Sequence, residues 1–292
     1  RGGLAVGSIL ICTIFAAMAG ISGAATISMG VLAVPAMLNR GYSKDMAIGS
    51  IAAGGSLGIL IPPSVTMIVY GLVSGTSIGK LYAGGVLPGL LLSTLFILYI
   101  LIRSWLQPEL APAQADQKKI TIGDSVTLLK GLAFPLLLVF AVLGSIVVGI
   151  ASISEAAVIG ALGSMLAAWL KGQLDWSVTK ETCFQTLLLT CLIFWIIIGA
   201  SALSTFYTAM GAASMIESIV LGWEVNRYVI LLGITTLLLI MGTVIDTIGI
   251  IMITAPVFVP IVEALGFDLV WFGVLFIVNM ETGFLTPPFG YN

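Results

Sequence analysis

The sequence predicts an all-α polytopic membrane protein, and three observations lead to this class. Of the 292 residues, 59% are hydrophobic and 8% are charged, and the mean hydropathy is +1.19. Soluble domains carry roughly a quarter charged residues, so 11 basic and 13 acidic side chains are too few for a polar surface. The apolar residues form runs that reach or exceed the roughly 20 residues a helix needs to cross a bilayer. The absence of histidine excludes His-based catalytic triads and His metal sites.

The apolar runs are separated by short polar segments. The runs lie at 4–38, 46–72, 81–103, 129–150, 152–170, 181–203, 206–221, 228–262 and 268–286. One longer stretch, 107–127, combines Pro, Ala, Gln and charge, a composition that predicts a surface linker. Because the chain begins at Arg1 and stops shortly after a double proline, we expect a fragment with both termini truncated.

Two of the runs, 4–38 and 228–262, are too long for one crossing. Small and polar residues interrupt them, at 20–23 in the first and 242–246 in the second. From Leu4 to Gly20 a helix rises about 24 Å, less than a bilayer core of about 30 Å. We therefore expect two re-entrant helical hairpins that turn near the midplane, where irregular backbone must be buried in protein or line a wet cavity. A single kinked span is the alternative interpretation.

A double-proline motif follows each hairpin. Residues 58–63 and 283–288 both fit G-x-L-x-P-P and are 225 residues apart, while the hairpin turns at Gly20 and Gly242 are 222 residues apart. We count five crossings between the hairpins, and an odd number places the second hairpin on the opposite membrane face. The sequence thus predicts an inverted-topology repeat, an arrangement of secondary transporters in which the substrate site lies at the interrupted helices.

This repeat divides the chain into three expected regions. Residues 1–72 form one half of a transport domain, with the hairpin 4–38 and the broken helix 46–72. Residues 73–205 form the scaffold and connecting helices, including the linker 107–127. Residues 206–292 form the second half, with the hairpin 228–262 and the broken helix 268–292. Nine of the 11 basic residues lie on the side of the linker, whereas Lys80 and Arg227 lie on the other, and the positive-inside rule makes the linker cytoplasmic.

The prolines predict backbone carbonyls without intrahelical partners. Pro63 disfavours a helical conformation at the preceding residue, and a proline donates no backbone hydrogen bond. The carbonyls of 58–61, and likewise those of 283–286, would then be unsatisfied at a depth without water. A hard cation such as Na⁺ suits these oxygens, and the helix that restarts at Ser64 offers its positive end to an anion. A proline kink that only shapes packing is the alternative.

Hydroxyl and carboxyl groups near the turns and breaks are candidate ligands. Hydroxyls there supply oxygens or cap the short helices, and an intramembrane carboxylate is costly enough to mark a functional position. Glu155 lies nearer a membrane face, where we expect a helix cap. The candidate substrate-binding residues are therefore Ser22, Thr26, Ser64, Asp246, Thr247 and Glu281.

Several of these segments together resemble a known family. They are GISGAA at 20–25, GILIPPS at 58–64 followed by YG at 70–71, SIGK at 77–80 with the glycines of 84–89, and GFLTPPFG at 283–290. In this order they resemble the large membrane subunit of tripartite ATP-independent periplasmic (TRAP) transporters, over essentially the whole chain. The resemblance implies an elevator-type fold of the ion-transporter superfamily and sodium-coupled uptake of a small organic anion across the bacterial inner membrane.

The resemblance also implies ligands and partners. The family's sodium sites map onto Ser22, Gly58, Ile61 and Pro63 for one ion, and onto Gly242, Gly283 and Thr286 for a second. The first turn carries Ile21 and Gly23 where serine is common in the family, so it offers fewer hydroxyl oxygens. The implied partners are a periplasmic substrate-binding subunit, a small four-helix membrane subunit, a small organic anion and the lipid bilayer, with no nucleic acid among them.

Other functional classes make different demands on the sequence. An intramembrane protease would need converging carboxylates or a His or Lys base, and no histidine and no deep lysine is present, so we expect no enzymatic activity. An ion channel needs neither inverted hairpins nor alternating access. The remaining alternative is a one-subunit sodium/dicarboxylate symporter of the related divalent-anion type, which would work without a binding protein.

Overall fold

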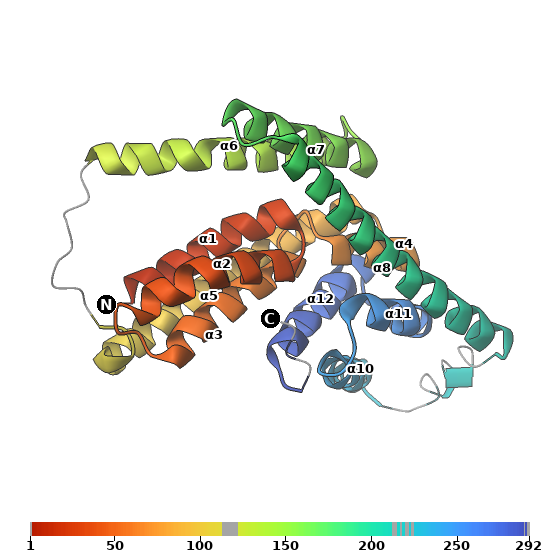
Figure 1. Cartoon of the computed structure of the whole chain (residues 1–292). Helices are drawn as coiled ribbons and strands as arrows, with labels where there is room; N and C mark the ends of the chain where they lie inside the picture. The colour runs from red at the N-terminus through yellow and green to blue at the C-terminus, as the bar shows by residue number, and fades with distance from the viewer. Residues whose placement is uncertain are drawn as a thin grey trace. The chain divides into compact units, whose positions relative to one another are not determined.

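The chain is all-helical in the part that the structure describes. The computed structural model describes residues 2–112, 122–211, 215–216, 218–219, 222, 225–288 and 290. Every regular element within these ranges is a helix, which confirms the predicted all-α class (Figure 1). Four of the described helices are long and apolar enough to cross a membrane: α5 (Ile78–Leu106), α7 (Ile153–Leu170), α11 (Thr247–Ala264) and, over Trp176–Leu203, α8 (Trp176–Ala209).

The chain forms two compact units, one of residues 1–112 and 193–292 and the other of residues 113–192. In the second unit, α6 (Ile122–Val147) packs against α7. A capping box begins α7: the Glu155 backbone N–H donates to the Ser152 hydroxyl at 3.3 Å, and the Ser152 N–H donates to the Glu155 carboxylate at 2.7 Å. This confirms the cap expected of Glu155. Because α6 begins at Ile122, a helix starts inside the segment 107–127 that was expected to be a linker.

In the first unit, both long apolar runs are interrupted where the sequence predicts. α1 (Gly3–Ala19) ends at Gly20, whose φ of 68° lies in the left-handed region that glycine adopts without steric cost, and α2 (Ser22–Leu38) follows at once. α10 (Arg227–Gly242) is separated from α11 by four residues. The 17 residues of α1 rise only about 26 Å, less than a bilayer core of about 30 Å. The re-entrant path of these hairpins stays a prediction.

The two double-proline motifs also interrupt helices. α3 (Lys44–Ser56) continues into the 3₁₀ helix η1 (Leu57–Ile59) and stops before Pro62, and α4 (Val65–Ser74) begins after Ser64. α12 (Leu269–Leu285) stops at Thr286, directly before Pro287. Both motifs therefore end one helix, and at the first motif a second helix restarts.

Buried apolar side chains join the two ends of the chain within the first unit. α1, α2 and α3 pack on one another and α5 lies along α1 (Figure 1), around a core that includes Ile9, Cys12, Met37 and Ile51. α4 packs against α11 and α12, and α10 packs against α12. Tyr70 of α4 contacts Phe276 of α12 with ring centroids 5.7 Å apart, and its hydroxyl donates to the Leu269 carbonyl at 3.2 Å. Helices about 200 residues apart in sequence therefore share one core.

Candidate functional site

The turn of the first hairpin, between α1 and α2, lies directly on the first helix break. A Cβ atom added to Gly58 would lie 2.7 Å from the Ile21 carbonyl oxygen and 3.1 Å from the Ser22 Cα. A Cβ added to Gly20 would lie 2.6 Å from the Pro63 carbonyl oxygen. The Val65 N–H donates to the Gly20 carbonyl at 3.1 Å, which satisfies the first turn of α4. We call this contact the first tip.

The first tip brings together most of the residues predicted for the first cation. Ser22 begins α2 and is buried, and it lies against Gly58. Pro63 presents its carbonyl oxygen to the same turn. Ile61 lies between them in sequence, and its side chain is buried against Gly89 of α5. Backbone oxygens from the turn and from the break therefore converge at one place.

The second hairpin makes the same kind of contact with the second break. A Cβ added to Gly283 would lie 2.9 Å from the Cα, carbonyl carbon and carbonyl oxygen of Gly242. The Thr286 N–H donates to the Gly283 carbonyl at 3.1 Å, and the Thr286 hydroxyl donates to the Thr282 carbonyl at 2.7 Å. This contact, the second tip, gathers the three residues predicted for the second cation.

Helix ends give both tips a defined electrostatic character. α1 and η1 end at the first tip, and α10 and α12 end at the second. The C-terminal end of each helix carries about half a negative charge from its unpaired carbonyls. The N-termini of α2 and α4 begin at the first tip and carry the opposite sign. Each tip can therefore attract a cation to carbonyl oxygens, and the first tip also offers amides to an anion.

The hydroxyl of Ser64 serves the break itself. It accepts from the Met67 N–H at 3.3 Å as the N-cap of α4, and it donates to the Ile59 carbonyl. Ile59 therefore has a donor, which differs from the expectation that every carbonyl of 58–61 lacks one. The difference arises because the chain folds back at Pro62 and places Ser64 within reach of the preceding turn.

Local hydrogen bonds also occupy two more of the predicted substrate-binding residues. Thr26 donates to the Ser22 carbonyl at 3.1 Å, and its side chain packs on Gly55 of α3. Asp246 is the N-cap of α11 and accepts from the Ile248 N–H at 3.0 Å, so it fixes the turn. Thr247 is buried, and its hydroxyl oxygen has no hydrogen-bond partner among the described residues. Thr247 is thus the hydroxyl most available to a ligand at the second hairpin.

The structure adds a contact that the sequence analysis missed. Ser56 of α3 donates from its hydroxyl to Oε1 of Glu281 on α12 at 3.0 Å, and the two side chains are 0% and 1% exposed. Glu281 Oε2 has no hydrogen-bond partner in the described part of the chain. The two residues are 225 positions apart, the offset that relates the double-proline motifs. Each residue precedes the glycine of its double-proline motif by two positions. An alignment of the two motifs would therefore have paired Ser56 with Glu281, whereas neither segment alone indicates the contact.

The oxygen atoms at the tips suit Na⁺ better than they suit a transition metal. No cluster of three or more Cys, Asp or Glu that could hold a metal occurs among the described residues. A cation at either tip would be held by backbone carbonyls and hydroxyls, the ligands that hard cations prefer and that broken helices offer to coupling ions. The partnerless oxygens of Thr247 and Glu281 are further buried donors of electron pairs in this unit.

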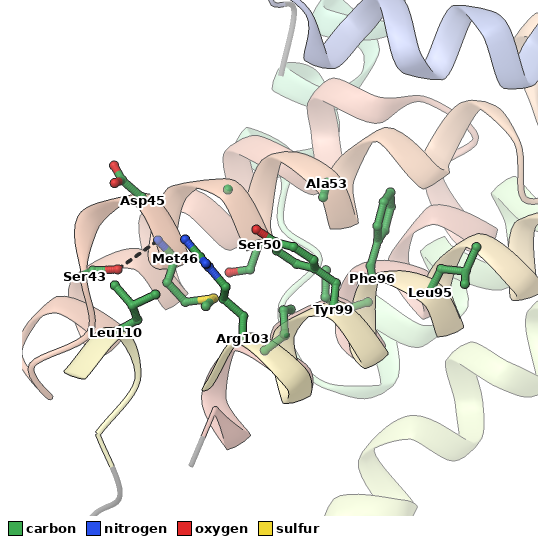
Figure 2. Close-up of a pocket in the computed structure, with 13 residues that line it drawn as sticks. Ser43, Asp45, Met46, Ser50, Ala53, Leu95, Phe96, Tyr99, Arg103 and Leu110 are labelled. Atoms are coloured by element: carbon green, nitrogen blue, oxygen red, sulfur yellow. Dashed lines mark hydrogen bonds between the residues drawn. The ribbon is translucent and has the colours of Figure 1, made fainter. Parts of the chain in front are cut away.

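A separate cavity of about 530 Å³ lies in the same unit between α3 and α5. Its lining includes Met46 and Ser50 of α3 and Phe96, Tyr99 and Arg103 of α5 (Figure 2). No predicted ligand residue lines this cavity. It is therefore distinct from both tips.

Comparison with known proteins identifies the family. Residues 1–292 match the family described as the DctM component of tripartite ATP-independent periplasmic transporters. The chain is 33% identical over 295 residues to the C4-dicarboxylate TRAP transporter large permease protein DctM of Pseudomonas aeruginosa, covering 100% of this chain and 67% of that protein.

Two further relatives carry other names. The isethionate TRAP transporter permease protein DctMQ of Oleidesulfovibrio alaskensis is 31% identical over 292 residues, covering 100% of this chain and 45% of that protein. The ectoine TRAP transporter large permease protein TeaC of Halomonas elongata is 30% identical over 296 residues, covering 99% of this chain and 67% of that protein. The chain therefore belongs to the DctM family of TRAP large permeases, which are inner-membrane transport proteins and not enzymes.

Proposed function

We propose that the chain is the large membrane subunit of a sodium-coupled importer of a small organic anion, working by elevator-type alternating access. Its proposed partners are a periplasmic substrate-binding subunit and a small four-helix membrane subunit, because TRAP large permeases work with a binding protein and a small membrane subunit. The observation that carries the proposal is the pair of tips, where two hairpin turns meet two broken helices backbone to backbone.

Sodium coupling is supported by what converges at the tips. Two helix C-termini end at each tip, and their carbonyl dipoles favour a bound cation. Among the residues that the structure describes, no Lys or Arg is buried at either tip, so the charge of an incoming organic anion would be offset by helix N-termini and by bound cations. Because attraction between opposite charges is strong where water is excluded, bound Na⁺ would raise the affinity for the anion.

An elevator-type movement is supported by the packing. Gly58 and Gly283 leave no space for a side chain between turn and break, and Ser56 bonds to Glu281 between the two repeats. Elements joined so closely would move together as one body, because packed cores deform little and switch between discrete arrangements. A cation that bridges turn and break would hold each hairpin closed during this movement.

The names of the relatives suggest the class of substrate. They are named for C4-dicarboxylates, isethionate and ectoine. Each of these compounds carries a carboxylate or sulfonate that is ionised at neutral pH. We therefore propose a small organic acid for this chain as well.

Replacing Thr286 by alanine tests the cation assignment. The change removes one hydroxyl oxygen from the second tip and leaves the helix break in place, so we expect the Na⁺ concentration for half-maximal uptake to rise about two- to tenfold. Ser22→Ala should act similarly at the first tip. The measurement is uptake by the assembled transporter in proteoliposomes with its binding protein. Thr282→Ala is the matched control, because Thr282 is exposed on the same helix and donates only to the Val278 carbonyl at 3.2 Å.

Two outcomes would contradict the proposal. Full uptake in sodium-free buffer driven by a proton gradient would contradict sodium coupling. An unchanged Na⁺ requirement in both variants would contradict the assignment of the cation sites. Equal uptake of free substrate with and without the binding protein would instead support the one-subunit symporter.

A further inference from the structure

The cavity between α3 and α5 combines an apolar floor with one cationic side chain. At about 530 Å³ it has the size of a small-molecule site. Its inner wall is formed by buried residues, including Ile9, Met46 and Ile100. Its outer wall belongs to α5, where Leu95 is 49% and Tyr99 is 62% exposed. A ligand here would contact protein on one side and the surroundings of α5 on the other.

The polar groups of the cavity gather around the end of Arg103. Figure 2 shows the Arg103 side chain running toward Met46 and Ser50 of α3, with the Tyr99 hydroxyl nearby. Asp45 also lines the cavity, but its carboxylate points away from this group (Figure 2). In the part of the chain that the structure describes, Arg103 forms no ion pair. Its five N–H donors are therefore available to a phosphate, which a guanidinium binds in a bidentate manner.

The position of the cavity indicates where the phosphate comes from. Arg40 and Lys44 lie at the connection between α2 and α3, next to Ser43, which lines the cavity. The basic-residue count predicts that this end faces the cytoplasm. The cytoplasmic leaflet carries anionic lipids that attract basic residues near the membrane surface. Exposed leucines of α5, such as Leu91 and Leu98, continue from the outer wall toward the membrane interior.

We propose that this cavity binds an anionic phospholipid of the cytoplasmic leaflet. The phosphate lies on Arg103, with the Ser50 and Tyr99 hydroxyls as neighbours, and an acyl chain follows Phe96 and Leu95 along α5. Lipid bound here bridges α3, which continues into the first helix break, and α5. The proposal depends on the predicted orientation and not on sodium coupling, so either can fail without the other.

Lipid retention by the assembled transporter tests the proposal. The complex is purified in mild detergent, exposed to mixed micelles of phosphatidylglycerol and phosphatidylethanolamine, and retained lipid is counted by native mass spectrometry. We expect wild type to retain phosphatidylglycerol preferentially. Arg103→Gln should lower this retention at least fivefold, because the bound phosphate loses the charge-assisted hydrogen bonds of the guanidinium. Arg40→Gln, which removes the same charge from the same end outside the cavity, should change retention less than twofold.

A second variant fills the cavity without changing its charge. A Cβ added to Gly49 meets no atom within 4 Å, and Gly49 lines the cavity. Gly49→Leu therefore introduces a side chain into open space and favours the helix, and it should also lower phosphatidylglycerol retention at least fivefold. Unchanged retention in either variant overturns the proposal. Displacement of the retained ligand by succinate also overturns it, because the cavity would then be a site for small anions.

Discussion

Replacing Ser56 by alanine should weaken the contact between the two repeats. Within the described structure, the Ser56 hydroxyl is the donor to Glu281 Oε1, and Oε2 has no partner. The two side chains are 0% and 1% exposed, so bulk water does not reach the carboxyl group. Ser56→Ala would leave both carboxyl oxygens without a hydrogen bond.

The expected loss of stability follows from this burial. Leaving a buried polar group unsatisfied costs about 1–3 kcal/mol. Because serine and alanine differ by one oxygen atom, the change creates almost no cavity and adds little to this figure. For a domain of 150–250 residues, each kcal/mol lowers the thermal midpoint by about 2–4 °C, so we expect a fall of roughly 2–12 °C.

Thermal unfolding of the purified complex measures this effect, with midpoints compared at one heating rate because membrane proteins unfold irreversibly. Ser50→Ala is the matched control, because Ser50 is also buried on α3. Its hydroxyl oxygen lies 3.1 Å from the Ala47 carbonyl oxygen, as the Ser56 hydroxyl oxygen lies 2.8 Å from the Ala53 carbonyl oxygen. Ser50 has no described partner on α12, so its loss should cost less. In combination with Glu281→Gln, Ser56→Ala should be non-additive by more than about 0.5 kcal/mol. Equal midpoints for the two serine variants, or strict additivity, would refute the reasoning.

Two further predictions concern the tips and the orientation. Gly283→Ala should abolish most uptake and destabilise the protein by about 1–3 kcal/mol, because the added Cβ would lie 2.9 Å from the Gly242 backbone. Gly49→Ala, whose Cβ meets open space, should leave uptake unchanged and should not destabilise the protein, because alanine favours the helix. Similar uptake in both variants would show that the second tip tolerates separation. Single cysteines are placed at Ser77 and at Gln114, which lies outside the described residues, in a background without native cysteines. They should react with an impermeant thiol reagent from opposite sides of the membrane. Reaction of both from the periplasm would contradict the predicted orientation.

The sequence alone predicted the features that depend on local backbone chemistry. The break at Gly20 follows from a glycine that adopts positive φ, and the breaks at Pro62 and Pro287 follow from missing backbone donors. These restrictions act whatever the surrounding helices do, so single-chain patterns reveal them. The Glu155 cap is local in the same sense, because its partner Ser152 is three residues away.

Features that depend on tertiary contacts were not accessible in the same way. Ser56 is a small residue in an apolar helix, and the sequence around it does not indicate a partner. The packing of α3 on α12 brings it to Glu281. The cavity joins Ser50 to Arg103 across two helices, and nothing in either segment alone marks it. The helical start of α6 at Ile122 was missed for another reason: polarity argued against a membrane span, but a polar segment can still be helical outside the hydrocarbon.

The Ser56–Glu281 contact bears on how the two repeats are arranged. In a pair of units related by a twofold rotation, a residue touches its own counterpart only near the axis. Ser56 and Glu281 are counterparts by their offset of 225 residues, and they touch. A twofold relation between the repeats would therefore place its axis between α3 and α12, with one tip on either side. Under perfect symmetry this position would hold two glutamates that repel or two serines too short to meet. The difference between the two segments instead provides one donor and one acceptor, so under a twofold relation a departure from symmetry at the axis would stabilise the arrangement of the tips around it.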